Sequence, residues 1–283
     1  MAEAQDIQEK IPGVLACDVG NTAVHFAYVK GDVVTPVRHI RVGGRGGPGG
    51  DHVGRGAQGE SGGDAGLVAA MVELWSQMPA PRKVVAASVN PAGLALLESA
   101  AMEAIHEAVL VVGRDVPLPI DTKLAGPEKI GVDRLCAAVA AFDRLGVACV
   151  VADFGTAVTV DCVDDQGVFL GGAILPGLGM GAAALHAQTA QLPEVEPAAP
   201  DWVFGRDTRE AIVGGLVFAA RGALKELVEL YATELGHWPV VILTGGDAAL
   251  VCPDVNGSGL VQAIVPDLVI RGVAAAYYRT LLK

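Results

Sequence analysis

Two short segments of the sequence share a pattern of residues that could bind phosphate. Each has an apolar run followed by Asp-x-Gly and a threonine, at Asp18-Val-Gly20-Asn-Thr22 and at Asp153-Phe-Gly155-Thr156. A turn rich in glycine and threonine exposes backbone N–H groups and hydroxyls that can hold phosphate oxygens. A carboxylate at the end of a strand can hold a cation, directly or through water. Two such turns that face each other across a cleft would bind a polyphosphate together with its magnesium ion.

A single turn of this kind is explained equally well as an ordinary β-hairpin, because Asn and Gly are common hairpin residues. The two aspartates lie 135 residues apart (153 − 18), which is nearly half of the 283-residue chain. A pattern that recurs at corresponding positions indicates a structural unit that occurs twice. The repetition therefore favours phosphate binding over a structural hairpin.

A third segment, Gly131-Val132-Asp133-Arg134, places a carboxylate and a guanidinium side by side where an Ala-rich, helix-forming stretch begins. An acidic residue in the first turn of a helix is favoured by the helix dipole, and this alone explains Asp133. The same two side chains could also orient or deprotonate a hydroxyl and pair with an anion. The residues by themselves leave both interpretations open.

Composition excludes several classes of protein. Hydrophobic residues make up 52% of the chain and charged residues 18%, and no apolar run approaches the length of about 20 residues that a spanning helix needs. The 32 acidic residues outnumber the 20 basic ones, and the resulting net charge of −12 disfavours binding to nucleic acid. The polar N-terminus lacks the features of a secretory signal, and the five cysteines lack a CxxC spacing. We expect a cytoplasmic protein with buried, reduced thiols and no membrane or nucleic-acid partner.

Strand-like and helical runs alternate along the chain and predict two α/β units. The predicted strands are 14–17, 24–29, 33–42, 83–89, 109–112, 147–153, 157–163, 168–174 and 239–244. Within 33–42, Pro36 limits part of the strand to a sheet edge. The predicted helices are 67–78, 91–101, 132–145, 181–189, 208–235 and 269–282. Between them, half of residues 43–66 are glycine, which predicts a mobile surface excursion without helix or strand. The stretch from Gly171-Gly172 to Pro176-Gly177 predicts a strand-to-helix connection with close backbone approach.

Six motifs in this order resemble those of the type III pantothenate kinase family, within the superfamily of acetate and sugar kinases, heat-shock chaperone ATPases and actin. Besides the three segments above, they are Gly171-Gly172 to Gly177, Gly205-Arg-Asp-Thr208 and Thr244-Gly-Gly246. The resemblance implies an α/β fold of two ribonuclease-H-like domains with mixed β-sheets flanked by helices. Residues 1–128 would form the first domain, with the phosphate 1 turn, and residues 129–283 the second, with the phosphate 2 and adenosine turns.

The resemblance also implies a function, the ATP-dependent phosphorylation of pantothenate to phosphopantothenate in coenzyme A biosynthesis, by a homodimer. The family's general base corresponds to Asp133, and the pantothenate ligands correspond to Gly131, Val132, Asp133, Arg134 and Thr208. The ATP-binding residues correspond to Asp18, Val19, Gly20, Asn21, Thr22, Ala23, Val24, His25 and Thr156. By the same resemblance, Asp18 would help to hold Mg²⁺, and Asp153 would bind a monovalent cation, K⁺ or NH₄⁺. Without the family, Thr208 would be interpreted as the N-cap of the long helix, and Asp153 as a strand-end residue that accepts backbone N–H bonds.

Two features depart from the family's pattern. The family usually has an aromatic residue shortly before the Gly-x-Asp-Arg motif, and residues 119–130 contain none, which puts a substrate contact there in doubt. The glycine-rich segment 43–66 is also atypical. Two other functions remain open, a non-catalytic regulatory protein that binds nucleotide and a kinase of the same superfamily for another small hydroxyl substrate. The Asp133-Arg134 pair favours the pantothenate kinase, because a protein that only binds nucleotide has no use for a base.

Overall fold

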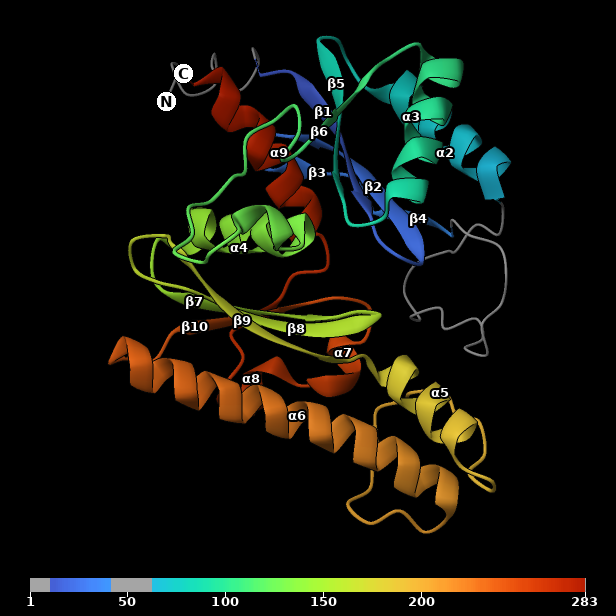
Figure 1. Ribbon diagram of the computed structural model, residues 1–283, viewed down its shortest axis with the longest axis vertical. Coiled ribbons are helices and arrows are strands. Elements are labelled where there is room, and N and C mark those ends of the chain that lie inside the picture. The colour runs from blue at the N-terminus through green and yellow to red at the C-terminus, as the bar shows by residue number, and fades with distance from the viewer. Residues whose placement is uncertain (1–10, 42–62, 283) are drawn as a thin grey trace.

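The computed structural model describes residues 11–41 and 63–282, which contain two β-sheets with helices between and around them (Figure 1). In the first sheet the strands follow the order β3-β2-β1-β5-β6, and β4 also pairs with β2. The hairpin of β1 and β2 is antiparallel, and β5 and β6 continue the sheet in parallel on the other side of β1. The strands are β1 (Gly13–Val19), β2 (Ala23–Lys30), β3 (Val33–Val34), β4 (Arg38–Arg41), β5 (Arg82–Ser88) and β6 (Val109–Val111).

The second sheet repeats this topology. Its order is β11-β10-β7-β8-β9, with an antiparallel β7–β8–β9 meander on one side of the central strand β7 and two parallel strands on the other. Its strands are β7 (Cys149–Phe154), β8 (Ala157–Val163), β9 (Phe169–Pro176), β10 (Val240–Thr244) and β11 (Ala263–Ile264). The repeated strand order confirms the prediction of two ribonuclease-H-like units with mixed sheets flanked by helices.

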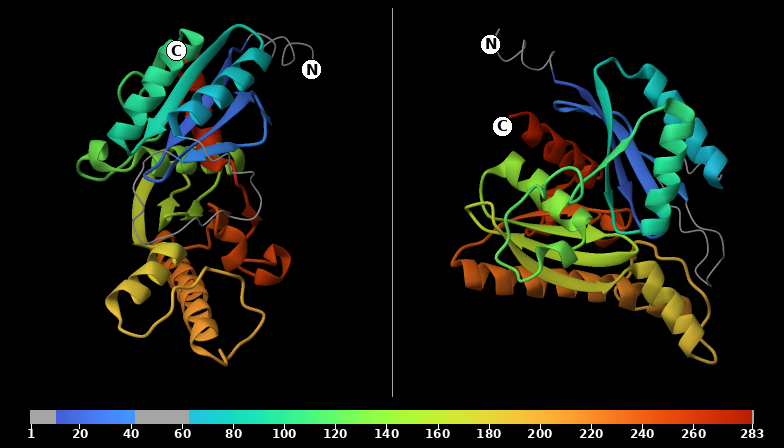
Figure 2. Two further views of the ribbon diagram at one scale, coloured as in Figure 1. Left: turned by 90° about the vertical axis from the view of Figure 1, so that its right-hand side faces the viewer. Right: turned by 45° about the horizontal axis from the view of Figure 1, so that its top comes forward.

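Helices cover both faces of the two sheets, as Figure 2 shows from two further sides. Apolar side chains of α2 and α3 pack on one face of the first sheet, and those of α6 and α7 pack on the outer face of the second. The helices are α2 (Gly63–Gln77), α3 (Pro91–Ile105), α4 (Val132–Leu145), α5 (Leu178–Gln188), α6 (Thr208–Leu235), α7 (Ala248–Val251), α8 (Val255–Ser258) and α9 (Leu268–Leu281), with a 3₁₀ turn at η1 (Pro127–Lys129).

Two helices, α4 and α9, lie between the sheets. One side of α4 packs with α9 against the first sheet, and the other side packs on the inner face of the second sheet. The two helices cross closely at Gly272, where an added Cβ would lie 1.9 Å from the carbonyl oxygen of Cys136. The C-terminal helix therefore completes the core of the N-terminal sheet. The predicted domain boundary between residues 128 and 129 stays a prediction.

The structure corrects two predictions of secondary structure. The strand predicted over 33–42 is divided into β3 and β4, because Pro36 between them has no N–H group for the sheet. Of the glycine-rich segment, 43–62 lies outside the described residues, whereas Gly63 to Gly66, predicted to be non-helical, begin α2. Within 11–41 and 63–282, no helix combines the length and the apolar character required to cross a bilayer.

Candidate active site

The two repeated turns lie against each other. The hydroxyl oxygens of Thr22 and Thr156 are 3.2 Å apart and share a hydrogen bond, although 134 residues separate them in the sequence. Each turn follows the first strand of its sheet and is closed by a backbone hydrogen bond, from Gly20 N–H to the Ala23 carbonyl at 3.0 Å and from Gly155 N–H to the Ala157 carbonyl at 3.2 Å. Two hairpins that face each other were expected from the repeated pattern, and the structure places them so.

Neighbouring elements fix the position of each turn. Asn90 accepts hydrogen bonds from the first turn of α3 through Oδ1, and its Nδ2 donates to the Gly20 carbonyl at 3.2 Å. At the second turn, Gly177 N–H donates to the Thr156 carbonyl at 3.2 Å. An added Cβ at Gly177 would lie 2.4 Å from the carbonyl oxygens of both Gly155 and Thr156. This close approach of the Gly171–Gly177 segment was predicted, whereas the role of Asn90 was not.

The predicted ATP-binding residues form the first hairpin from the end of β1 to the start of β2. Thr22 and Asn21 are exposed at the tip of the turn. The side chains of Val19 and Val24 are fully buried in the core beneath α2 and α3, so they can contact a ligand only through their backbones. Asp18 and His25 are opposite each other in the hairpin, with 3.5 Å between Asp18 Oδ2 and His25 Nδ1.

Three predicted aspartates, Asp18, Asp133 and Asp153, share one electrostatic environment although they come from β1, α4 and β7. Burial, together with the charges of Asp18 and Asp133, raises the pKa of Asp153 to about 7. Burial followed by the charge of Asp18 raises the pKa of Asp133 as well. Carboxylates that raise each other's pKa attract either protons or a cation. The arrangement therefore suits a bound cation beside a carboxylate that can act as a base.

His25 responds to the same charges. Partial burial lowers its pKa, but the hydrogen bond to Asp18 and the charges of Asp18 and Asp153 raise it on balance. The protonated imidazole would therefore offset part of the negative charge at the first turn.

The predicted adenosine turn follows β10, which runs parallel to β7 with Thr244 opposite Asp153. Gly245 has a φ of +90°, a conformation that favours glycine. An added Cβ there would also lie 2.4 Å from Asp153 Oδ1. The described residues give the Asp153 carboxylate no hydrogen-bond partner, so the interpretation of Asp153 as an acceptor of backbone N–H bonds is not supported.

The Gly131–Arg134 motif forms the N-terminus of α4, as the sequence predicts. Gly131 is the N-cap, and Asp133 Oδ1 accepts a hydrogen bond from the backbone N–H of Arg134 at 2.8 Å. An added Cβ at Gly131 would lie 2.5 Å from this oxygen, so glycine leaves the space that the Asp133 carboxylate occupies. Val132 is buried against the first sheet and positions the turn through packing.

One residue of this group, Asp161, was not predicted from the sequence. Its carboxylate pairs with the Arg134 guanidinium, which donates from Nε to Oδ2 at 3.0 Å and from Nη2 to Oδ1. Asp161 lies in β8, on the face opposite to Val158, Val160 and Cys162, which pack in the core beside α6. A charged residue within the strand-forming run 157–163 was the signal in the sequence, because a buried carboxylate needs a partner.

Thr208 is not brought together with the other predicted residues. It is exposed at the first position of α6, and the N-cap is Asp207, whose side chain accepts a hydrogen bond from Glu210 N–H at 2.8 Å. The alternative interpretation of Thr208 as the N-cap is therefore wrong, because the Asp207 carboxylate takes that position.

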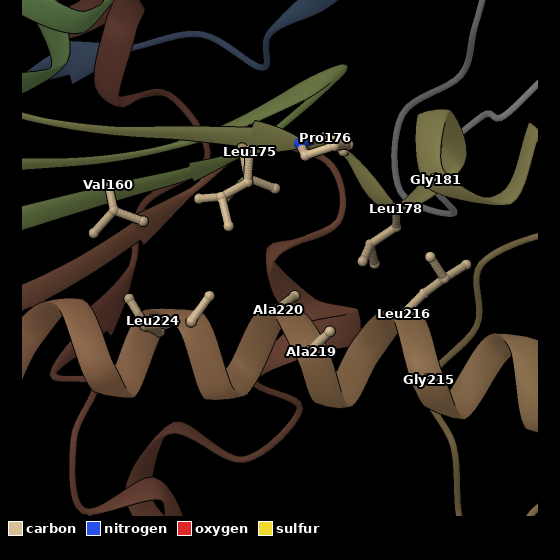
Figure 3. A pocket seen from close by; sticks show the side chains of 13 residues that line it. Val160, Leu175, Pro176, Leu178, Gly181, Gly215, Leu216, Ala219, Ala220 and Leu224 are labelled. Carbon is tan, nitrogen blue, oxygen red and sulfur yellow. The ribbon is translucent and has the colours of Figure 1, made fainter. Parts of the chain in front are cut away.

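The predicted residues do not line the apolar cavity of about 240 Å³ that lies between the second sheet and α6. Figure 3 shows Val160 and Leu175 directed from the strands toward Leu216, Ala220 and Leu224 of α6. Side chains alternate between the faces of a strand, so the cavity lies on the face of β8 opposite Asp161. Its lining has no charged residue, and the candidate site is instead the group of aspartates and turns between the sheets.

Comparison with known proteins gives matches that span most of the chain. A family model described as type III pantothenate kinase matches residues 14–230. A type III pantothenate kinase from Dehalococcoides mccartyi is 31% identical over 93% of this chain and 96% of its own length. One from Rhodospirillum rubrum is 38% identical over 68% of this chain and 74% of its own length.

Two solved structures resemble the fold. A protein described as a Baf family transcriptional activator from Campylobacter jejuni gives a TM-score of 0.57 at 17% identity, covering 95% of this chain and all of its own. The ethanolamine utilization protein EutJ from Carboxydothermus hydrogenoformans gives 0.50 at 13% identity, covering 94% of this chain and 90% of its own. At these identities the two structures support the fold and carry no information on function.

Proposed function

The chain belongs to the type III pantothenate kinase family, and on this basis we propose how it transfers the terminal phosphoryl group of ATP to the primary hydroxyl of pantothenate in coenzyme A biosynthesis. The observation that supports the proposal most directly is the contact between Thr22 and Thr156, which joins the two turns. The charges of Asp18 and Asp133 both act on Asp153. A polyphosphate held by both turns would therefore lie near a carboxylate that can serve as a base.

ATP is held mainly by backbone N–H groups of the first hairpin, from Val19 to His25, and by Thr156 of the second. Asp18 helps to hold Mg²⁺. The described residues contain no group of three His, Cys, Asp or Glu side chains placed to bind a metal. Mg²⁺ bound together with a nucleotide commonly takes most of its ligands from phosphates and water. When bound, Mg²⁺ neutralises charge on the phosphate oxygens during transfer.

Asp133 is the general base. Oδ1 is held by the Arg134 N–H group, and the carboxylate accepts the proton of the pantothenate hydroxyl as the hydroxyl attacks phosphorus. Burial and the charge of Asp18 raise the pKa of Asp133, and a base with a higher proton affinity is more effective. Gly131 and Val132 place the carboxylate, and Arg134 pairs with the carboxylate of pantothenate.

Asp153 binds a monovalent cation, K⁺ or NH₄⁺. The support is its half-buried carboxylate, whose pKa is raised to about 7 and which has no hydrogen-bond partner among the described residues. A cation bound there would reduce the repulsion among the three aspartates.

The position of Thr208 supports a homodimer. Thr208 is exposed at the start of α6, so we propose that it contacts pantothenate in the partner subunit. Phe204, near Thr208 in the sequence, is 83% exposed and Ile174, on the edge strand β9, is 64% exposed, and we propose that the partner subunit covers these side chains. We also propose a cytoplasmic location, where ATP is available and the five buried cysteines remain reduced.

The test is the formation of phosphopantothenate by the purified protein with ATP, Mg²⁺ and pantothenate, in K⁺ and in Na⁺. We expect product in K⁺ and less in Na⁺. The control is Asp133→Asn, which keeps an oxygen to accept the Arg134 N–H bond and should lose on the order of 10²-fold or more in turnover. No product from the parent protein in K⁺, with consumption of another hydroxyl substrate, would instead identify a kinase of different specificity.

A further inference from the structure

The ion pair between Arg134 and Asp161 is enclosed by protein. Arg134 donates from Nε and Nη2 to the two carboxylate oxygens of Asp161, and the two side chains are 16% and 2% exposed. A guanidinium bound through two parallel hydrogen bonds is fixed in plane and direction, which a single bond does not achieve. The side chain of Arg134 is therefore held in one orientation before any substrate is bound.

The surroundings of Asp161 leave room for this pair and for little else. Gly172 lies directly opposite Asp161 in the β8–β9 register, and an added Cβ there would be 2.4 Å from Asp161 Oδ1. Phe169 of β9 lies beneath the guanidinium, with 5.7 Å between Arg134 Cζ and the ring centroid, where the aromatic face favours a cation. Strand β9 thus forms one wall of the site that holds the Arg134 guanidinium.

The pair uses the Nε and Nη2 side of the guanidinium. Nη1 takes part in none of the hydrogen bonds found within the described residues, so its N–H groups remain for another acceptor. Asp133, the residue before Arg134 in the first turn of α4, is the proposed base. An anion on Nη1 would therefore be bound by the same helix turn that carries the base.

We propose that Asp161 is a positioning residue, which fixes Arg134 so that the Nη1 side of its guanidinium receives the carboxylate of pantothenate. This inference rests on the function proposed above. Asp161 also gives the buried guanidinium a counter-charge before substrate arrives, since an unpaired buried charge is strongly unfavourable. Asp161 acts only through Arg134 and does not itself contact the substrate.

The inference is tested by Asp161→Asn with two substrates, pantothenate and pantothenol, in which the carboxylate is replaced by an alcohol. Since the change weakens the orientation of a charged hydrogen-bond donor, we expect KM for pantothenate to rise on the order of tenfold or more, with kcat and the KM for ATP changed much less. For pantothenol, parent and variant should have similar kcat/KM. The matched control is Asp164→Asn in the same β-meander, because Asp164 is also buried but accepts hydrogen bonds from the backbone of its own turn. This control should alter stability without altering the preference between the two substrates.

A second measurement tests the inference if Asp161→Asn alone does not fold, and it compares Arg134→Gln with the double variant Arg134→Gln/Asp161→Asn. In Arg134→Gln, no charge remains for Asp161 to orient, so adding Asp161→Asn should change KM for pantothenate no further. An additive effect in the double variant would overturn the inference, as would equal losses for pantothenate and pantothenol in Asp161→Asn. If the parent protein phosphorylates pantothenate and Asp161→Asn has the same kinetics, the role of Asp161 is refuted while the proposed function stands. A parent protein with no activity on pantothenate refutes the proposed function, and the inference with it.

Discussion

Replacing Asp153 with asparagine should make the cation-free protein more stable at neutral and alkaline pH. Burial, with the charges of Asp18 and Asp133, raises the pKa of Asp153 to about 7 from the ordinary 3.8. These values differ by about three, and each pKa unit corresponds to about 1.4 kcal/mol. The ionised carboxylate therefore costs the folded state up to about 4 kcal/mol, and Asp153→Asn removes the charge with little change of shape.

The direction of the pH dependence follows from the raised value. Between pH 3.8 and about 7, the carboxylate of the unfolded chain is ionised while that of the folded protein still holds its proton. The contribution of Asp153 to stability is therefore fully present below 3.8 and is lost as pH rises through about 7. The free energy of unfolding of the parent protein should fall over this range more steeply than that of Asp153→Asn.

The measurement is urea unfolding of both proteins at several pH values in a buffer without K⁺ or NH₄⁺, repeated with K⁺. Added K⁺ should stabilise the parent protein and leave Asp153→Asn unchanged, because a ligand stabilises only the state that binds it. Asp165→Asn is the matched control, since the Ala148 N–H group lowers the pKa of this exposed aspartate and its small contribution is lost as pH falls instead. Parallel pH curves for the parent protein and Asp153→Asn would refute the reasoning.

Three further predictions concern the proposed base and the two turns. The acid limb of kcat/KM should lie above about pH 4, the range of an ordinary aspartate, because burial raises the pKa of Asp133; a pH profile with its acid limb at or below that value contradicts the assignment. Gly177→Ala should raise KM for ATP by about tenfold and lower the free energy of unfolding by about 1–3 kcal/mol, since the methyl group displaces the second turn. Its control is Gly222→Ala, where an added Cβ meets nothing within 4 Å and α6 should gain up to about 1 kcal/mol. Thr22→Val and Thr156→Val should each raise KM for ATP severalfold while changing the free energy of unfolding by less than about 1 kcal/mol. The measurements are initial-rate kinetics and urea unfolding. An unchanged KM for ATP with a lower free energy of unfolding would show that the contact is purely structural.

The parts of the fold that depend on local sequence could be predicted. The repeated Asp-x-Gly turn indicated both hairpins and a structural unit that occurs twice, whereas the type of fold was implied by the family resemblance. The helices over 132–145 and 208–235 begin and end where the apolar spacing placed them. Close approach at Gly177 was also predictable, because glycine there follows a strand and precedes a helix. In each case the information lies within one continuous segment of the sequence.

The parts that depend on contacts between distant elements could not be predicted. Asp161 is 27 residues from Arg134, and nothing in either segment specifies the other as its partner. Asn90 was assigned no role, although it joins α3 to the first turn 70 residues earlier. The helical start of α2 at Gly63 was missed because glycine has a low helix propensity, which predicts that the helix begins later.

The position of α9 has a consequence for the folding of the N-terminal sheet. Ile270 and Val273 of this helix pack with Val14 and Ala16 of the first strand, so one face of that sheet is covered by a segment from the far end of the sequence. Contacts between such distant segments form only after a large loss of chain entropy. The strands of the N-terminal sheet therefore do not form an independent unit, because without α9 their valines and alanines on that face would be open to solvent.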